Sequence, residues 1–324
     1  MRPLRRRIAP GWWPLARKPA KPSEGRMTQT LEKLARQTGS MRGIRSVVHT
    51  MKTLSVINAA PYERAARAIE LYHETVLEGL HAFLTSFGPI PERPPSKAPQ
   101  ILIVFGSDHG LCGNYNEALA RHVSDQINGT PATHPRVLCV GAQMADALAD
   151  QRITVDQTLF PAASVDGIGR LANLLTRRLE HLRNTAQARE IAVSLAYVTQ
   201  DGRQKQSPAV TSLLPIDDVL LSDLQTKPWV SRSRPSFSMP ANALFMALVR
   251  SHLFATLFRA IAEALMTENA ARLALMQQAE KSVDARLEDL MSETRRVRQD
   301  EITTELLDVI IGFEALKEGK VKLP

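Results

Sequence analysis

The sequence predicts an α+β protein in which a long antiparallel coiled coil of N- and C-terminal helices carries an inserted Rossmann-like α/β domain. The segment 241–311 contains neither Gly nor Pro, and a second helical pattern covers 28–86. Between them, short apolar runs alternate with helical stretches, which is typical of an α/β sheet. We divide the chain into a disordered basic extension, an N-terminal coiled-coil region, an α/β domain and a long C-terminal coiled-coil helix, at residues 1–26, 27–97, 98–232 and 233–324.

The C-terminal helix has the clearest pattern. The segment 241–311 is rich in Ala, Leu, Glu, Arg and Met, which are strong helix formers. Apolar residues recur at helical spacing, as in Leu257, Ile261 and Leu265, and Pro240 marks the start. A single helix here would be about 107 Å long at ~1.5 Å per residue, which favours a stalk over an ordinary core helix.

The N-terminal helical pattern runs from residue 28 to 58 and then meets Pro61. Because proline removes a helical hydrogen bond, we expect a break or kink there. A second helical stretch, 62–87, ends before Gly88. The two chain ends thus supply two long helices, and an antiparallel pair with a domain at one end is the simplest arrangement.

The central domain predicts strands and helices in alternation. Apolar runs predict buried strands, namely 101–105, 137–140, 190–198 and 211–216. Helical patterns lie between them, at 115–127, 142–150 and 166–184. This order predicts a mostly parallel sheet, and 225–239 is interpreted as the linker into the long helix.

Composition excludes several classes of function. The net charge is +8, but the first 26 residues hold eight of the 41 basic residues and one of the 33 acidic residues. The rest is balanced, so we expect no nucleic-acid partner. Cys112 and Cys139 are too few for a disulfide framework or a zinc site and favour a reducing compartment. No run of 18 apolar residues occurs, so we expect no direct membrane insertion, and no metal or cofactor.

Residues 1–26 allow three interpretations. They form an extension upstream of a true start at Met27, an organelle transit peptide, or a functional disordered arm, since they are Arg-rich and acid-poor.

A glycine-containing turn follows the first predicted strand. Its glycines allow positive φ and close packing, and Asn114 or Asn116 is suited to cap the next helix. The turn is neither a dinucleotide fingerprint nor a phosphate loop. Cys112 with His109 allows a nucleophile-and-base interpretation, against a buried small residue in a turn. Asp108 is either a metal ligand or, more simply, a backbone-capping or solvent-facing residue.

The turn resembles a signature of the gamma subunit of F-type ATP synthases. The residues that carry this resemblance are Ser107, Asp108, Gly110, Leu111, Cys112, Gly113 and Asn116. Three further segments resemble the same family in the same order, at 44–54, 268–273 and 298–306. The resemblance spans about 28–316.

This resemblance implies a non-catalytic rotor subunit without a cofactor. Its partners would be the alpha and beta subunits of the catalytic hexamer, the epsilon subunit and the membrane c-ring, on the cytoplasmic face of the inner (plasma) membrane. The coiled coil would turn inside the hexamer and change the affinity of each catalytic subunit for nucleotide. The expected contacts with those subunits are Met51, Lys52, Arg298, Gln299 and Thr303.

The sequence also departs from the family pattern. Pro61 stands where a basic stretch is usual, and Lys52 and Thr53 replace the usual residues beside Met51. These departures resemble the alternative N-type or sodium-type branch. Two other functions are the alternatives: a Rossmann-like enzyme with Cys112 as nucleophile, or a generic coiled-coil scaffold.

Overall fold

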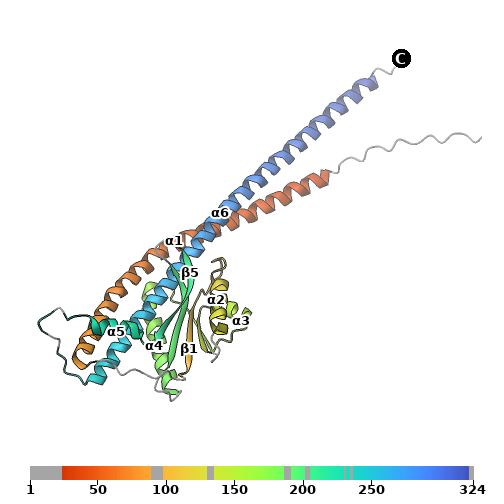
Figure 1. Ribbon diagram of the computed structural model, residues 1–324. Coiled ribbons are helices and arrows are strands. Elements are labelled where there is room, and N and C mark those ends of the chain that lie inside the picture. The colour runs from red at the N-terminus through yellow and green to blue at the C-terminus, as the bar shows by residue number, and fades with distance from the viewer. Residues whose placement is uncertain are drawn as a thin grey trace, which may run out of the picture. The chain divides into compact units, whose positions relative to one another are not determined.

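The computed structural model describes residues 24–88, 98–129, 135–185, 191–200, 205–229, 231–233 and 236–320. Most of the basic extension therefore lies outside the described residues. The elements, labelled in Figure 1, are α1 (Glu24–Phe87), β1 (Gln100–Phe105), α2 (Tyr115–Gly129), β2 (Arg136–Val140), α3 (Ala142–Asp150), β3 (Gln157–Leu159), α4 (Val165–Thr185), β4 (Ala192–Gln200), β5 (Gln206–Leu214), α5 (Asp218–Thr226) and α6 (Ala241–Lys320).

The chain packs as two compact units. The helix-pair unit contains the described residues up to Arg45 and those from Val283 onward, and the sheet unit is Ser46–Ser282. Both long helices contribute to each unit. This division follows packing, whereas the four-part division from the sequence follows element type and stays a prediction.

The sheet has five strands in the order β3-β2-β1-β4-β5. Every neighbouring pair is parallel except β4 with β5, which confirms the mostly parallel sheet. Helices α2 and α3 cover one face, while α4 and α6 cover the other (Figure 1). The central strands are therefore buried on both sides, which is why they are continuous apolar runs in the sequence.

Strand β1 shows how this two-sided burial arises. Side chains alternate between the faces of a strand. Ile101, Ile103 and Phe105 accordingly join the core under α4 and α6, while Leu102 and Val104 join the core under α2 and α3. One strand thus links the two halves of the sheet unit.

Helix α6 is part of the core of the sheet unit. The predicted stripe of Leu257, Ile261 and Leu265 is buried, at 0%, 2% and 7% exposure. Contacts between α6 and α1 run in opposite order along the two helices, which makes the pair antiparallel: Arg259 with Glu70, His252 with His73, and Phe245 with Phe83.

The predicted helix break at Pro61 is wrong. Helix α1 continues through this residue, so the expected second helix is a continuation of the first. A proline inside a helix costs about 3 kcal/mol. Burial of Tyr62 and Ile69 in the sheet unit offsets that cost, and Ile57, whose carbonyl loses its helical partner, is 60% exposed and open to water.

The smaller elements were predicted less well. Helix α3 was placed correctly, but β5 begins five residues before the predicted strand and ends two residues earlier. Strand β3 and helix α5 were not predicted, and only the end of α5, at residues 225–226, overlaps the supposed linker. Helix α6 also passes Gly312, beyond the predicted end at 311.

Candidate functional site

The turn after β1 is held by a buried polar cluster around Asn116. The Asn116 side chain accepts a hydrogen bond from the backbone N–H of Ser107 (3.0 Å) and donates to the Ser107 hydroxyl (2.7 Å). The Cys112 thiol lies 3.5 Å from that hydroxyl. Asn116 therefore fastens the turn from the first residues of α2 and does not cap the helix.

Asp108 joins the turn to the beginning of helix α3. Its carboxylate accepts a hydrogen bond from the backbone N–H of Ala142, the first residue of α3 (3.1 Å). An acid at this position also suits the positive end of the helix dipole. The backbone-capping interpretation of Asp108 is therefore the one that the structure supports.

Positive φ in this turn follows the predicted glycines only in part. Within the turn it occurs at Leu111 (φ 64°) and Gly113 (φ 68°), whereas Gly110 is not among the residues with positive φ. Close approach occurs instead at Gly106 and Gly141, where an added Cβ would lie 2.4 Å from Met144 and 2.5 Å from the carbonyl oxygen of Ser107. Leu111 is a strained position that the sequence pattern did not reveal.

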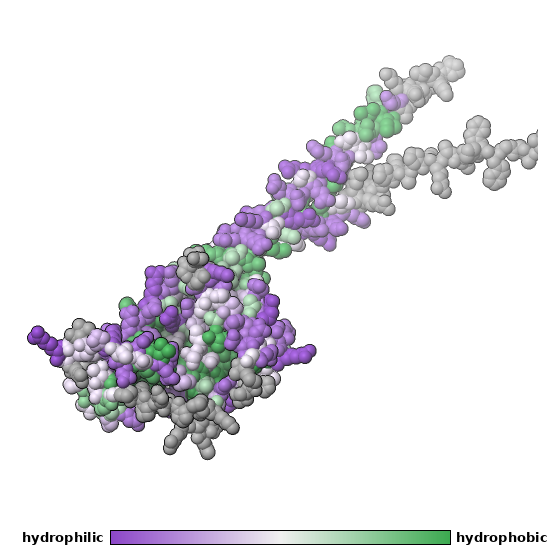
Figure 2. Space-filling model, viewed as in Figure 1, coloured by the Kyte–Doolittle hydropathy of each residue, from purple (hydrophilic) through white to green (hydrophobic). Residues whose placement is uncertain are grey.

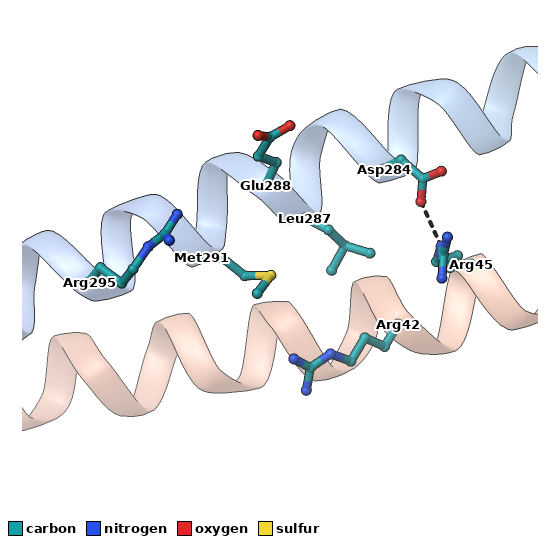
Figure 3. A pocket seen from close by; sticks show the side chains of 7 residues that line it. All are labelled: Arg42, Arg45, Asp284, Leu287, Glu288, Met291 and Arg295. Atoms are coloured by element: carbon teal, nitrogen blue, oxygen red, sulfur yellow. Dashed lines mark hydrogen bonds and ion pairs between the residues drawn. The ribbon is translucent and has the colours of Figure 1, made fainter.

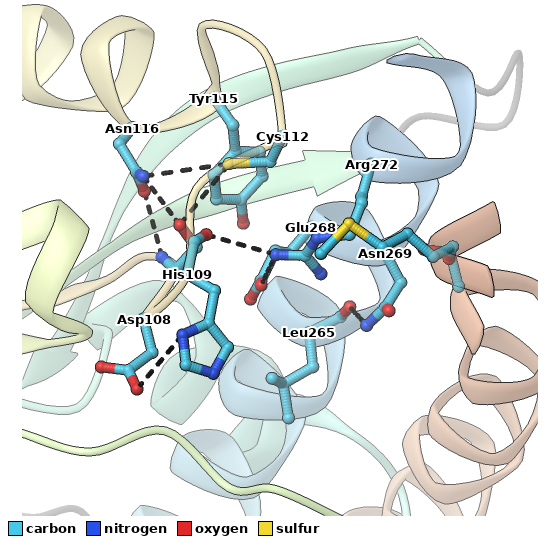
Figure 4. Close-up of polar contacts among 12 residues, drawn as sticks. Asp108, His109, Cys112, Tyr115, Asn116, Leu265, Glu268, Asn269 and Arg272 are labelled. Carbon is cyan, nitrogen blue, oxygen red and sulfur yellow. Dashed lines mark hydrogen bonds and ion pairs between the residues drawn. The ribbon is translucent and has the colours of Figure 1, made fainter. Parts of the chain in front are cut away.

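The turn also contacts α6, as Figure 4 shows. Arg272 donates to the carbonyl oxygen of His109 (3.3 Å) and pairs with Glu268 at 2.6 Å. Both charged side chains are largely buried. Burial raises the pKa of Glu268, while Arg272 opposes that shift. The signature residues thus form a structural contact between the α/β domain and α6.

This turn does not have the chemistry of an active site. Burial raises the pKa of the Cys112 thiol, so the nucleophilic thiolate is disfavoured. His109 is exposed and reaches Asp108 at 4.0 Å. Within the described ranges, no group of three His, Cys, Asp or Glu side chains could hold a metal ion.

The helix-pair unit contains an open groove of about 540 Å³ between α1 and α6 (Figure 3). Leu287 and Met291 form its apolar part, and three arginines with two acids line it: Arg42, Arg45, Arg295, Asp284 and Glu288. Arg45 is paired with Asp284 at 2.6 Å. Arg42 and Arg45 were missed by sequence analysis, although their spacing places both near one helix face.

The five predicted contact residues are divided between the units. Arg298, Gln299 and Thr303 are exposed on α6 in the helix-pair unit. Met51 and Lys52 are half-buried on α1 in the sheet unit. Lys52 is engaged inside the chain, because its Nζ lies 2.6 Å from Glu280.

The last part of α6 exposes many apolar side chains. They gather towards its described end in Figure 2 and are more than half exposed, namely Ile302, Leu306, Leu307, Val309, Ile310, Ile311 and Phe313. Such a continuous apolar surface is typical of a partner contact. By length and composition, α6 over Ala241–Glu314 is also apolar enough to cross a membrane, a test that core helices pass too.

Together, these features define a class of protein: a helical stalk of two chain ends with an inserted α/β domain that lacks catalytic groups in its described part. The chain belongs to the ATP synthase family, whose model matches residues 30–316. The ATP synthase gamma chain of Sulfurovum sp. is 23% identical over 302 residues, covering 89% of this chain and 99% of that relative. The gamma chain of Anaeromyxobacter sp. (strain K) is 26% identical over 310 residues with the same coverage.

Solved structures share the fold. A chain of the Euglena gracilis mitochondrial ATP synthase, determined with OSCP, F1 and c-ring, has a TM-score of 0.60 at 17% identity. It covers 92% of this chain and is itself covered to 97%. A chain from the rotor of the same enzyme has a TM-score of 0.55. The family and the gamma-subunit fold inferred from the signature turn are therefore confirmed.

Proposed function

We propose that the chain is the central-stalk rotor, the gamma subunit, of an F-type ATP synthase. It couples transmembrane ion flow to ATP synthesis or hydrolysis and is itself non-catalytic. One observation carries this conclusion: α1 and α6 come from opposite ends of the chain, flank an inserted α/β domain, and lie largely within residues 30–316, which the family model matches. The catalytic step belongs to partner subunits.

The helix-pair unit has the surface that such a rotor requires inside a hexamer. Its exposed apolar residues, such as Leu306 and Ile310, offer contact without strong directional bonds. Arg42, Arg45 and Arg295 around the groove suit acidic segments of the catalytic subunits. These features favour a surface that moves past successive partners.

Specific contacts are assigned as part of this proposal. Arg298, Gln299 and Thr303 contact loops of the catalytic subunits, and their exposure on α6 supports that role. Met51 and Lys52 contact the same class of partner from α1. The Lys52 contact competes with its ion pair to Glu280.

The partners are the alpha and beta subunits of the hexamer, the epsilon subunit and the c-ring. The chain is held at the membrane through this complex, on the cytoplasmic face, and does not insert. Leu253 and Leu257 within α6 are core residues of the sheet unit. These residues support a core helix over a membrane span.

The two alternatives have less support. An enzyme based on Cys112 would need an accessible thiolate, but the thiol is buried and its pKa is raised by burial. A scaffold without rotation would share the fold, so the distinction must come from experiment.

The decisive experiment is a reversible cross-link. The Thr303→Cys variant is assembled with the hexamer subunits, joined by a disulfide to a cysteine in a catalytic subunit, and assayed for ATP hydrolysis before and after reduction. Rotation predicts that turnover stops in the cross-linked complex and returns on reduction. Uncross-linked Thr303→Cys is the matched control. Undiminished turnover in the cross-linked complex would exclude the rotor.

A further inference from the structure

Polar groups of the α/β domain converge on one turn of α6. The hydroxyl of Tyr115, on α2, donates to the carbonyl oxygen of Ala264 at 3.0 Å and lies 3.2 Å from the Thr267 hydroxyl. Thr267 donates to the carbonyl oxygen of Val198, on β4, at 3.0 Å. The side-chain amide of Gln206, on β5, donates to the carbonyl oxygen of Thr267 at 3.0 Å. Three elements of the domain therefore hold this turn.

The two hydroxyls of this cluster have several acceptors within reach. Each hydroxyl carries one proton and can also accept. Tyr115 donates to the carbonyl oxygen of Ala264, while Thr267 donates either to Val198 or, within α6, to the carbonyl oxygen of Glu263 or Ala264, each at 3.0 Å. Thr267 is 0% exposed and Tyr115 is 4% exposed. Water cannot replace these bonds when they break, so each is costly to lose.

Around this cluster, α6 contacts the rest of the sheet unit through apolar side chains, several of which are small. Ala260, Ala262 and Ala264 are buried here, and alanine side chains form low ridges on a helix. Apolar burial opposes separation, but it has no preferred direction. Hydrogen bonds depend on angle as well as distance. The polar cluster therefore resists rotation of α6 about its own axis more specifically than the alanine contact does.

We propose that Tyr115 and Thr267 are positioning residues that lock α6 to the α/β domain and carry torque between them. The proposal rests on the rotor function and adds to it the place where load passes from the domain to the long helix. The signature turn supports the same joint, because Arg272, one helical turn beyond Thr267, bonds to the carbonyl oxygen of His109.

The test uses the assembled complex in sealed vesicles. Tyr115→Phe and Thr267→Val each remove the hydroxyl while keeping similar volume. ATP hydrolysis is measured with an ionophore that collapses the gradient, and ATP-driven membrane potential is measured with a voltage-sensitive dye. We expect hydrolysis without load to remain within about twofold of the original, while the ratio of potential generation to hydrolysis falls at least about threefold, the scale of one lost hydrogen bond.

Two further variants separate torque transmission from packing. Thr267→Ser retains the hydroxyl and should preserve most of the ratio. Tyr62→Phe removes the hydroxyl of an equally buried tyrosine on α1 and should leave the ratio unchanged. An unchanged ratio in both Tyr115→Phe and Thr267→Val complexes overturns the proposal. So does failure of both variants to assemble, because a purely structural role then accounts for them.

The rotor function fails separately. If the unsubstituted chain neither assembles with the hexamer subunits nor supports ATP-driven potential, the function itself is wrong. If the unsubstituted chain supports assembly and ATP-driven potential and the two hydroxyl variants behave like it, only the proposed role of Tyr115 and Thr267 is wrong.

Discussion

Lys52 on α1 lies 2.6 Å from Glu280 on α6, so a residue expected to contact a catalytic subunit also joins the two long helices of its own chain. His49 approaches the same carboxylate at 3.3 Å. The hydrogen bond from Lys52, followed by that from His49, lowers the pKa of Glu280. Glu280 therefore remains ionised and holds Lys52 over the range in which the complex would work.

The first prediction concerns this ion pair. Lys52→Glu and Glu280→Lys each place like charges together and should lower the ATPase rate of the assembled complex. The double exchange restores attraction, so its ATPase rate should be at least about twofold higher than that of either single variant, because contacting residues have coupled effects. No recovery in the double variant would mean that Lys52 acts mainly on a partner subunit. Rates of the four complexes, with assembly checked for each, decide between these outcomes.

The second prediction concerns the exposed contacts on α6. Arg298→Ala and Gln299→Ala should lower the ratio of ion pumping to hydrolysis while changing the melting temperature by less than about 2 °C, since both side chains are exposed. Arg296→Ala is the matched control on the same exposed helix and should do neither. Parallel loss of assembly and melting temperature would argue for a structural role instead.

The third prediction concerns acid stability. His73 and His252 share a hydrogen bond of 2.9 Å between α1 and α6. Burial, together with the neighbouring His73, lowers the pKa of His252 from 6.5 to about 4. Below pH 6.5, His252 therefore binds a proton in the unfolded chain that it does not bind in the folded chain. The contribution of His252 to the free energy of unfolding is fully present above pH 6.5. It is lost as the pH falls towards 4, by up to about 1.4 kcal/mol per pH unit.

Removing that group should flatten the decline. His252→Gln should lower the free energy of unfolding at pH 7.5 but reduce its dependence on pH between 6.5 and 4.5, as measured by urea denaturation of the purified chain. The unsubstituted chain is the comparison and should show the steeper slope. Equal slopes in the two chains would show that His252 titrates normally.

The fourth prediction separates two kinds of glycine. Gly141 has φ 107°, and an added Cβ would lie 2.5 Å from the carbonyl oxygen of Ser107. Gly141→Ala should therefore lower the free energy of unfolding by about 2–4 kcal/mol. Gly110 belongs to the signature, yet its nearest contact would be at 3.9 Å, so Gly110→Ala should cost less than about 1 kcal/mol. Denaturant titration of both variants measures the difference. Similar losses would mean that the Gly110 position is also constrained.

The fifth prediction addresses Cys112. As a buried small residue it should tolerate Cys112→Ala with about 1–2 kcal/mol of destabilisation and an unchanged ATPase rate in the complex. Alkylation of the thiol in the folded chain should be slow near neutral pH, because burial raises its pKa. A variant that assembles normally but loses activity would revive the catalytic interpretation.

The sequence predicted those elements whose signal is local. Helix α6 was located from a long segment without Gly or Pro and with helical spacing, and strand β1 from a continuous apolar run. Strand β3 has three residues and only partial burial, so its pattern is too short to detect. The helix break predicted at Pro61 does not occur, because the burial of Tyr62 and Ile69 outweighs the local penalty of a proline. No local sequence pattern shows that burial.

For the candidate site, too, the sequence predicted the local motif but not the contacts between distant segments. The signature from Ser107 to Asn116 was identified from its residue order, but its contact with Arg272 joins segments far apart in the chain. The positive φ of Leu111 was hidden because leucine rarely adopts it. The joint at Thr267 was missed because threonine in a helix has no distinctive spacing, and its partners come from three other elements.

The burial of α6 in the sheet unit has a consequence for synthesis. One face of the sheet is covered by Leu257, Ile261 and Leu265, which leave the ribosome long after the strands that they cover. The part of that face which α4 does not cover therefore stays exposed until residues 257–265 have left the ribosome. A message truncated before these codons would produce an aggregation-prone fragment, and chaperones are expected to bind the chain during that interval.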